Sequence, residues 1–177
     1  MIDLIDAVRP MFYKLAGAYV KSKISSVDAN FKPNHPLIVK GGGQITIGKN
    51  FRSLGPCYLN ANNGSIKIGD NCFLNRNVHV DAYGGEIEIG DDCLVGPNSI
   101  LRAANHGMVA GELIRNQPHV FGKVKIGNDV WVSANCVILG VELASHCVVG
   151  AGAVVTRSVK AFEVVGGVPA RPIGRRE

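Results

Sequence analysis

Two histidines in an interruption of an otherwise regular sequence are the residues best suited to proton transfer. His106 and His119 lie within residues 102–123, which read RAANHGMVAGELIRNQPHVFGK, whereas the chain on either side repeats with a short period. Imidazole has an ordinary pKa of about 6.5, so a neutral histidine can accept a proton at physiological pH. Spacing alone leaves two interpretations open, a general base or a histidine in a solvated turn.

The five cysteines are the other residues that could carry covalent or metal chemistry. Their number is odd, they form no CxxC pair, and their spacing is not that of a disulfide framework. This usage is typical of a reducing compartment, and we expect a cytoplasmic location, structural thiols and no metal site.

A repeat must position these residues. The tetrapeptides ITIG, IKIG, IEIG and VKIG begin at residues 45, 66, 87 and 124, and each opens a series of six-residue units with an aliphatic first position and a small or β-branched fifth position. A period of six excludes an amphipathic helix and favours short strands joined by bends, so that about eighteen residues form one triangular coil of a parallel β-helix. The fifth, inward position holds every cysteine: Cys57, Cys72, Cys93, Cys136 and Cys147.

Length and charge restrict the function further. The chain has 177 residues, 46% of them hydrophobic, and a formal net charge of +5, which indicates one domain and an anionic partner. Nucleic acid is disfavoured, because the chain has no basic stripe interleaved with aromatic residues. We expect neither a secretory signal nor a membrane span, since no apolar run has the necessary length.

The predicted organisation has four parts. Residues 1–30 have an apolar stripe typical of an amphipathic helical segment, interrupted at Pro10, and 31–43 form a linker into the first coil. The β-helix spans 44–159 with a loop at 107–123, and 160–177 form a C-terminal basic extension. The helical segment is expected to pack on the first coil or on a neighbouring subunit; peripheral membrane contact is the less favoured alternative, and its basic residues are Arg9, Lys14, Lys21 and Lys23.

Several ordered motifs resemble those of the hexapeptide-repeat acyltransferases. They are IGNDVWVSANCVIL at 126–139, VVGAGAVVT at 148–156 and VVGGVPARPI at 164–173. The chain is most similar to the group that contains maltose and galactoside O-acetyltransferases and the O-acetyltransferases of bacterial polysaccharides. The resemblance implies an all-β fold, a left-handed parallel β-helix, a homotrimer with active sites at the subunit interfaces, and acetyl-CoA as the co-substrate.

The resemblance also implies a role for the first histidine. His106 occupies the place of the family's catalytic histidine, where a long loop leaves the coils. It would act as the general base that accepts the proton of a saccharide hydroxyl during direct acetyl transfer in a ternary complex. No metal is required.

Four residues are candidates for binding the acceptor, each with an alternative. Asn75 matches an acceptor-binding asparagine, and Asn77 replaces it if the repeat register differs by two; either could instead cap a corner of a coil. His119 could orient His106, bind the acceptor or lie in solvent, and Glu112 is a candidate partner for an imidazolium.

The later coils contain the residues that match donor-binding positions. Trp131 would lie near the acetyl end or pack against the loop, and a backbone N–H near Ala134 would stabilise the oxyanion. The basic residue expected three positions after Arg171 is Gly174 here, so that Arg175 or Arg176 would replace it. The expected donor-binding set is Trp131, Ala134, Ala151, Thr156, Arg157, Arg171 and Arg175.

Three alternatives remain at this stage. An amino-sugar or nucleotide-sugar N-acetyltransferase would use the same fold and donor. A zinc hydro-lyase of the γ-carbonic anhydrase type would need a third histidine soon after His106, in addition to His79, and none follows within five residues. A non-catalytic β-helix scaffold would not need His106 together with the donor-binding residues.

Overall fold

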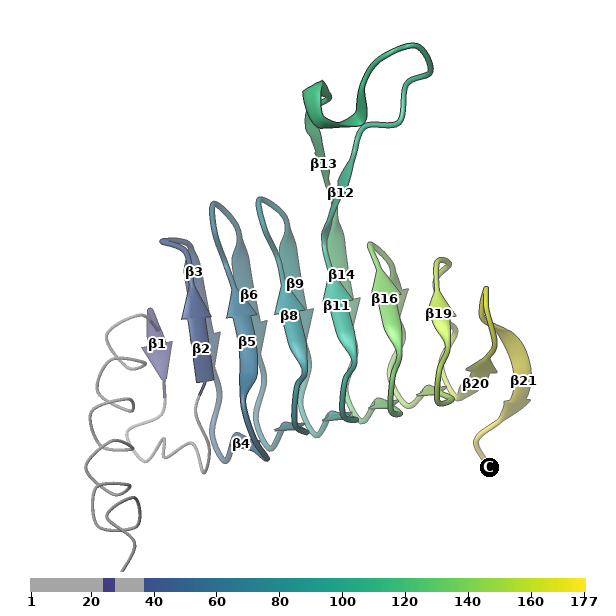
Figure 1. Cartoon of the computed structure of the whole chain (residues 1–177). Helices are drawn as coiled ribbons and strands as arrows, with labels where there is room; N and C mark the ends of the chain where they lie inside the picture. The colour runs from purple at the N-terminus through teal and green to yellow at the C-terminus, as the bar shows by residue number, and fades with distance from the viewer. Residues whose placement is uncertain (1–23, 28–36) are drawn as a thin grey trace, which may run out of the picture.

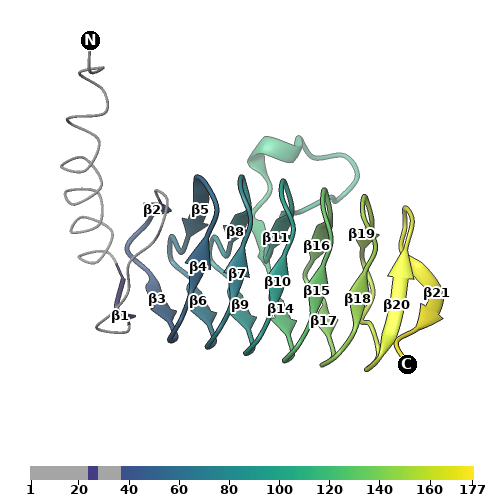
Figure 2. The same cartoon turned by 90° about the horizontal axis from the view of Figure 1, so that it is seen from below.

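The fold is a triangular prism of short strands. The structure, a computed structural model, describes residues 24–27 and 37–177. The chain passes through three sheets in a constant order, and adjacent coils pair in parallel (Figures 1 and 2). The two views together show that the coils wind left-handed. The predicted all-β, left-handed parallel β-helix is therefore confirmed.

We call the three faces of the prism A, C and B, in the order in which the chain visits them. Face A consists of β1 (Ser26–Val27), β3 (Gln44–Ile47), β6 (Ser65–Ile68), β9 (Glu86–Ile89), β14 (Lys123–Ile126) and β17 (Glu142–Leu143). Face C consists of β4 (Arg52–Ser53), β7 (Phe73–Leu74), β10 (Leu94–Val95), β15 (Trp131–Val132), β18 (Val148–Val149), β20 (Glu163–Gly166) and β21 (Arg171–Arg175). Face B consists of β2 (Leu37–Lys40), β5 (Cys57–Asn60), β8 (His79–Asp81), β11 (Ile100–Arg102), β16 (Val137–Leu139) and β19 (Val154–Val155). The edges between faces are AC, CB and BA.

Aliphatic side chains stack along the axis and form the core. On face A, Ile45, Ile66, Ile87 and Val124 align in register, and each is at most 1% exposed. Burying one such side chain contributes about 1.5–3 kcal/mol before conformational entropy is subtracted. The five cysteines are free and buried, which confirms their predicted inward positions.

Asparagine side chains stabilise one of the edges. At edge CB, Asn77, Asn98 and Asn135 have φ of 58°, 59° and 59°, in the left-handed region that asparagine tolerates better than most residues. The Nδ2 of Asn77 donates to Asn98 Oδ1 at 3.0 Å, and the Nδ2 of Asn98 donates to Asn135 Oδ1 at 3.2 Å. Asn77 therefore supports a corner of the coil, as one of the alternatives predicted.

The outward surfaces of the three faces differ in chemistry. The aligned outward column of face A is polar and charged: Thr46, Lys67, Glu88, Lys125 and Glu142. The corresponding column of face C is mostly apolar: Arg52, Phe73, Leu94, Trp131, Val148 and Val164. That of face B is also mostly apolar: Ile38, Tyr58, His79, Ile100, Val137 and Val154. Only face A has the composition of an ordinary solvated surface within the described residues.

A reversed strand ends the prism at its C-terminal end. Strand β21 pairs antiparallel with β20 and contains Pro172, so the 160–177 extension forms a hairpin. The hairpin is joined to edge AC because Asp129 binds both His146 Nδ1 at 3.0 Å and Arg176 Nη1 at 2.9 Å. The hydrogen bond from His146, and then Arg176, hold the pKa of the Asp129 carboxyl below its usual range.

The N-terminal side contains one strand within the segment treated as a linker. Strand β2 falls inside 31–43 and pairs with β5, because Leu37 and Val39 face the core and are buried. Most of the helical segment predicted over 1–30 lies outside the described residues, but the prediction is wrong at its described end, where Ser26 and Val27 form β1 and pair with β3. In the described part of the chain, no helix has the length and apolarity needed to cross a bilayer.

Candidate active site

A two-stranded ribbon projects from edge BA and carries both histidines of the interruption. It is formed by β12 (Ala104–His106) and β13 (His119–Phe121), which pair antiparallel (Figure 1). The 3-10 helix η1 (Ile114–Asn116) lies in the connection between them. The chain then returns to face A at β14 with its register intact, since Lys123 pairs with Glu86.

The two histidine rings lie against each other. His106 and His119 are direct partners in the ribbon, and their ring centres are 4.2 Å apart. Both side chains are partly buried, and the Nδ1 atom of each is shielded from solvent without a hydrogen-bond partner among the described residues. The sequence brought both histidines into one interruption, but only the structure shows that they form a pair.

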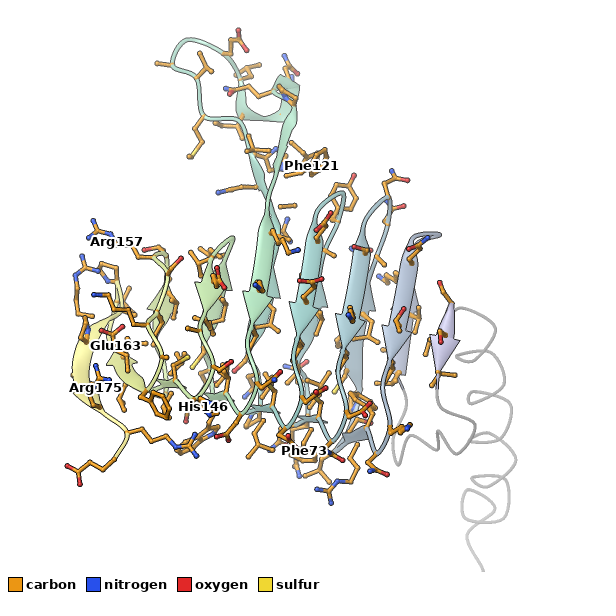
Figure 3. All side chains as sticks on the ribbon, turned by 180° about the vertical axis from the view of Figure 1, so that it is seen from behind. Phe73, Phe121, His146, Arg157, Glu163 and Arg175 are labelled. Atoms are coloured by element: carbon orange, nitrogen blue, oxygen red, sulfur yellow. The ribbon has the colours of Figure 1, made fainter. Side chains whose placement is uncertain are left out.

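Aromatic residues surround His119 on the side of the preceding coil. Tyr83 meets the His119 ring edge-on with centres 5.0 Å apart, and Phe121 lies 6.1 Å from the same ring. Phe121 covers Gly84, whose φ is +75° and whose missing side chain leaves room for the ring. Figure 3 shows Phe121 at the base of the ribbon. Nothing in the sequence places Tyr83 and Gly84 beside the ribbon, because this contact joins two coils that are distant in the chain.

An arginine fixes the base of the ribbon. Arg102 forms an ion pair with Asp81 of the preceding coil, and its Nε donates to the backbone oxygen of Ala104 at 2.9 Å. Asp81 also accepts a hydrogen bond from Asn60 Nδ2 at 3.0 Å. The direction in which β12 leaves edge BA is therefore set by side chains of the two coils before it.

A buried glutamine closes the loop beyond the histidines. Gln117 is 5% exposed, and its Oε1 accepts from the Val109 N–H at 2.7 Å while its Nε2 donates to the Val109 and Glu112 carbonyl oxygens at 3.0 and 3.1 Å. Glu112 itself is exposed, and no contact in the described residues joins its carboxylate to His106. The loop is ordered by its own amide network, whereas six large apolar side chains on the ribbon and loop remain exposed: Met108, Val109, Leu113, Ile114, Val120 and Phe121.

Two expected donor-binding residues lie on the same edge as the ribbon. Thr156 and Arg157 follow β19 at edge BA, two coils beyond the ribbon, and both are exposed. Figure 3 shows Arg157 on the side of the prism from which the ribbon rises. A cavity of about 160 Å³ lies where the ribbon meets the next coil. Its lining includes Asn105 and Val120 of the ribbon and Leu139 and Gly140 of that coil.

The remaining expected residues lie elsewhere on the prism. Trp131 is 51% exposed at the centre of face C. Asn75, Asn77, Ala134 and Ala151 all lie at edge CB. The Oδ1 of Asn77 is 3.4 Å from His79 Nε2. Arg171 and Arg175 are exposed in β21, and Figure 3 shows Arg175 at the C-terminal end.

One chain thus presents two separate groups of candidate residues. His106, His119, Thr156 and Arg157 belong to edge BA, whereas the acceptor asparagines and the small residues belong to edge CB. Most strands of the intervening face B have three or four residues, which corresponds to about 10 Å or more. A ligand that contacts both groups must lie between two copies of the chain or extend across face B.

The site offers an imidazole for proton transfer and exposed cations for an anionic ligand. His106 has one nitrogen, Nδ1, enclosed, so that Nε2 is the atom on which a substrate proton would be received. Among the residues that the structure describes, no three His, Cys, Asp or Glu side chains come together as metal ligands.

Comparisons with known proteins agree with this fold. The family model described as the hexapeptide repeat of succinyl-transferase matches residues 86–104 and 123–157, and the gap between the matches coincides with the ribbon. The galactoside O-acetyltransferase of Escherichia coli K12 is 36% identical over 80 residues, which are 45% of this chain and 39% of that protein. The aligned segments cover well under half of the curated relatives' own length.

Two solved structures extend the similarity to most of the chain. A galactoside acetyltransferase in complex with coenzyme A superposes with a TM-score of 0.59 at 28% identity, covering 90% of this chain and 68% of that one. AntD, an N-acyltransferase from Bacillus cereus in complex with dTDP and 3-hydroxybutyryl-CoA, superposes with a TM-score of 0.77 at 24% identity, covering 91% and 88%. At that identity, AntD shows a shared fold.

Proposed function

Because residues 86–104 and 123–157 match the hexapeptide-repeat family model, we propose that the chain is a hexapeptide-repeat acyltransferase that transfers an acetyl group from acetyl-CoA to a saccharide hydroxyl. Sugar or surface-polysaccharide modification in the cytoplasm is the setting we propose for this reaction. The observation that carries the proposal is the position of His106 on a paired ribbon at edge BA, the edge on which Thr156 and Arg157 also lie, two coils further along.

In this proposal His106 acts directly on the acceptor. Its Nε2 accepts the hydroxyl proton as the oxygen forms a bond to the thioester carbonyl carbon, and the imidazolium then returns that proton to the departing sulfur, which leaves as free thiol. General-base catalysis by a positioned side chain contributes about 10²–10⁴-fold. A backbone N–H near Ala134 would stabilise the negative charge on the carbonyl oxygen, and Asn75, Asn77, Glu112 and His119 are the acceptor-side candidates.

Donor binding is assigned to residues that combine small size with positive charge. Ala134 and Ala151 leave room for a pantetheine arm along edge CB, and Trp131 would lie near the acetyl end. Arg157, Arg171 and Arg175 are exposed cations, which suit the phosphates of coenzyme A, and Thr156 lies beside the first of them. No metal takes part in this scheme.

A homotrimer would bring the two groups of residues together. Faces B and C carry the apolar outward columns, whereas face A is charged, so we propose that face B of one copy meets face C of the next. The ribbon of one copy would then reach the Trp131 side of its neighbour, and the exposed apolar side chains of its loop would be covered there.

N-acylation of an amino sugar is the second candidate. The fold shared with AntD, an N-acyltransferase, favours it, because a neutral His106 could equally accept a proton from an attacking amine. The two candidates differ in the acceptor alone.

Thiol release from acetyl-CoA across a panel of neutral sugars and amino sugars tests both candidates. We expect turnover with at least one acceptor, a loss of about 100-fold or more in kcat for His106→Ala, and unchanged affinity of that variant for coenzyme A. Lys67→Ala, on charged face A, is the control and should retain full activity. Undiminished turnover of His106→Ala would disprove the assignment of the base.

A further inference from the structure

The pairing of His106 with His119 has a specific geometry. Backbone hydrogen bonds from the Gly107 N–H to the Pro118 oxygen, at 2.9 Å, and from the Gly122 N–H to the Ala103 oxygen, at 2.7 Å, flank the pair. Because bonded and non-bonded positions alternate in an antiparallel ribbon, His106 and His119 occupy a non-hydrogen-bonded position, where side chains approach most closely. Their ring contact is therefore built into the register of the ribbon.

Two polar atoms in this contact lack partners. The Nδ1 atoms of His106 and His119 are both shielded from solvent, and neither has a hydrogen-bond partner among the described residues. A shielded nitrogen without a partner is uncommon in folded proteins, and two of them on adjoining rings can satisfy each other. The ring centres are 4.2 Å apart with the planes tilted by 43°, so the two rings adjoin each other directly.

We propose that His119 is the positioning residue of the base, and this inference rests on the proposed function of His106. The Nδ1–H of His106 donates to the Nδ1 lone pair of His119, which leaves the Nε2 lone pair of His106 free to receive the acceptor's proton. His119 then carries its own proton on Nε2. A hydrogen bond to one ring nitrogen determines which tautomer a histidine adopts, so the pair would hold His106 in the tautomer that the reaction needs.

The surroundings of His119 suit a fixed partner. Tyr83 meets its ring edge-on at 5.0 Å, and Phe121 lies parallel to it within 18° at 6.1 Å. No carboxylate of the described residues contacts either histidine ring, so an imidazole takes the place that a carboxylate or carbonyl oxygen has beside other catalytic histidines.

Two substitutions separate this role from packing and from acceptor binding. His119→Phe keeps an aromatic ring against His106 and Tyr83 but has no acceptor, whereas His119→Asn keeps an acceptor atom near the position of Nδ1. We expect His119→Phe to lower kcat by about 10–100-fold with unchanged KM for donor and acceptor, and His119→Asn to retain most of the activity. In ¹⁵N spectra of the imidazoles, His106 should be the Nδ1–H tautomer in the wild type and should lose that preference in His119→Phe.

The alternative outcomes are distinct. Wild-type kcat in His119→Phe would overturn the proposal, and so would a raised acceptor KM with unchanged kcat in both variants, which would make His119 an acceptor-binding residue. His106→Ala, assayed beside them, separates the positioning role of His119 from the proposed function of His106. If His106→Ala is inactive while His119→Phe is fully active, only the positioning role fails. If His106→Ala is itself active, the proposed function fails.

Discussion

Burial separates the residues that hold the coils together from those that face a substrate. The five thiols are at most 1% exposed, and burial raises the pKa of both Cys57 and Cys147 to about 11. A thiol with such a pKa is almost entirely protonated at pH 8 and is a poor nucleophile. The cysteines therefore belong to the core, and the histidines of the ribbon are the groups left for chemistry.

The thiols give a test at the residue scale. We expect the native protein to react with fewer than about one equivalent of a thiol-specific disulfide reagent within minutes at pH 8, because none of the five sulfurs is accessible to the reagent. In denaturant all five should react, which provides the internal control. Rapid labelling of the native protein would show that at least one cysteine is accessible and would reopen a role for it.

How much of the site could be predicted depends on the range of the interactions. His106 was accessible from sequence because the six-residue period shows where the coils stop, and the resemblance supplies a role for the residue found there. The contacts of His119 with His106 and Tyr83 were not accessible, because they depend on the register of the ribbon and on the coil before it. The ribbon's anchoring by Arg102 was missed for the same reason.

At the scale of elements, the coils and the place of their interruption were predicted, whereas the strand pairing inside the interruption and at the C-terminal end was not. Local alternation of aliphatic and polar residues specifies the stacked strands, since each unit repeats the same inward positions. Strands β12 and β13 do not follow this repeat, and the pairing of β20 with β21 reverses its direction. Such pairs are determined by contacts between distant segments, which a local period does not encode.

The contact between Phe121 of the ribbon and Gly84 of the preceding coil gives a test at the scale of elements. In Gly84→Ala, the new methyl group would meet the Phe121 ring, and the φ of +75° would be strained for alanine. We expect the ribbon to be displaced, kcat to fall about tenfold or more, and the free energy of unfolding to fall by about 1 kcal/mol or more.

Gly111→Ala is the matched control for this substitution. Gly111 also has a positive φ, of +89°, but its added methyl group would meet nothing within 4 Å. It should therefore share the backbone strain without displacing Phe121, and it should keep most of the activity. Equal loss of kcat in the two variants would show that packing under Phe121 does not position the ribbon.

At the scale of the whole molecule, the unequal chemistry of the faces decides how copies would assemble. Leu94 and Trp131, on face C, are 46% and 51% exposed in the single chain. Because neighbouring positions on faces B and C are also apolar, a closed ring of three copies would cover both faces and leave the charged face A in solvent.

The assembly is tested by a charge placed on face C. We expect the wild type to have three times the 18.8 kDa mass of one chain in light scattering, and Leu94→Asp to shift toward the monomer mass, because an unpaired charge is costly to bury at an interface. Circular dichroism should be unchanged, since Leu94 points away from the core, and Lys67→Asp on face A should remain trimeric. A wild-type monomer with full acetyl transfer would contradict the shared site.

The reversal of β21 has a consequence for self-association. A stack of parallel coils exposes the same unpaired backbone groups at its terminus as it uses internally, so it could in principle add further chains end to end. Here the last strand runs the other way, carries Pro172 in place of an amide donor, and is tied down through Arg176 to Asp129. This reversal disfavours fibre-like growth from the β21 end of the prism, and it is consistent with the lateral contact through faces B and C that we propose.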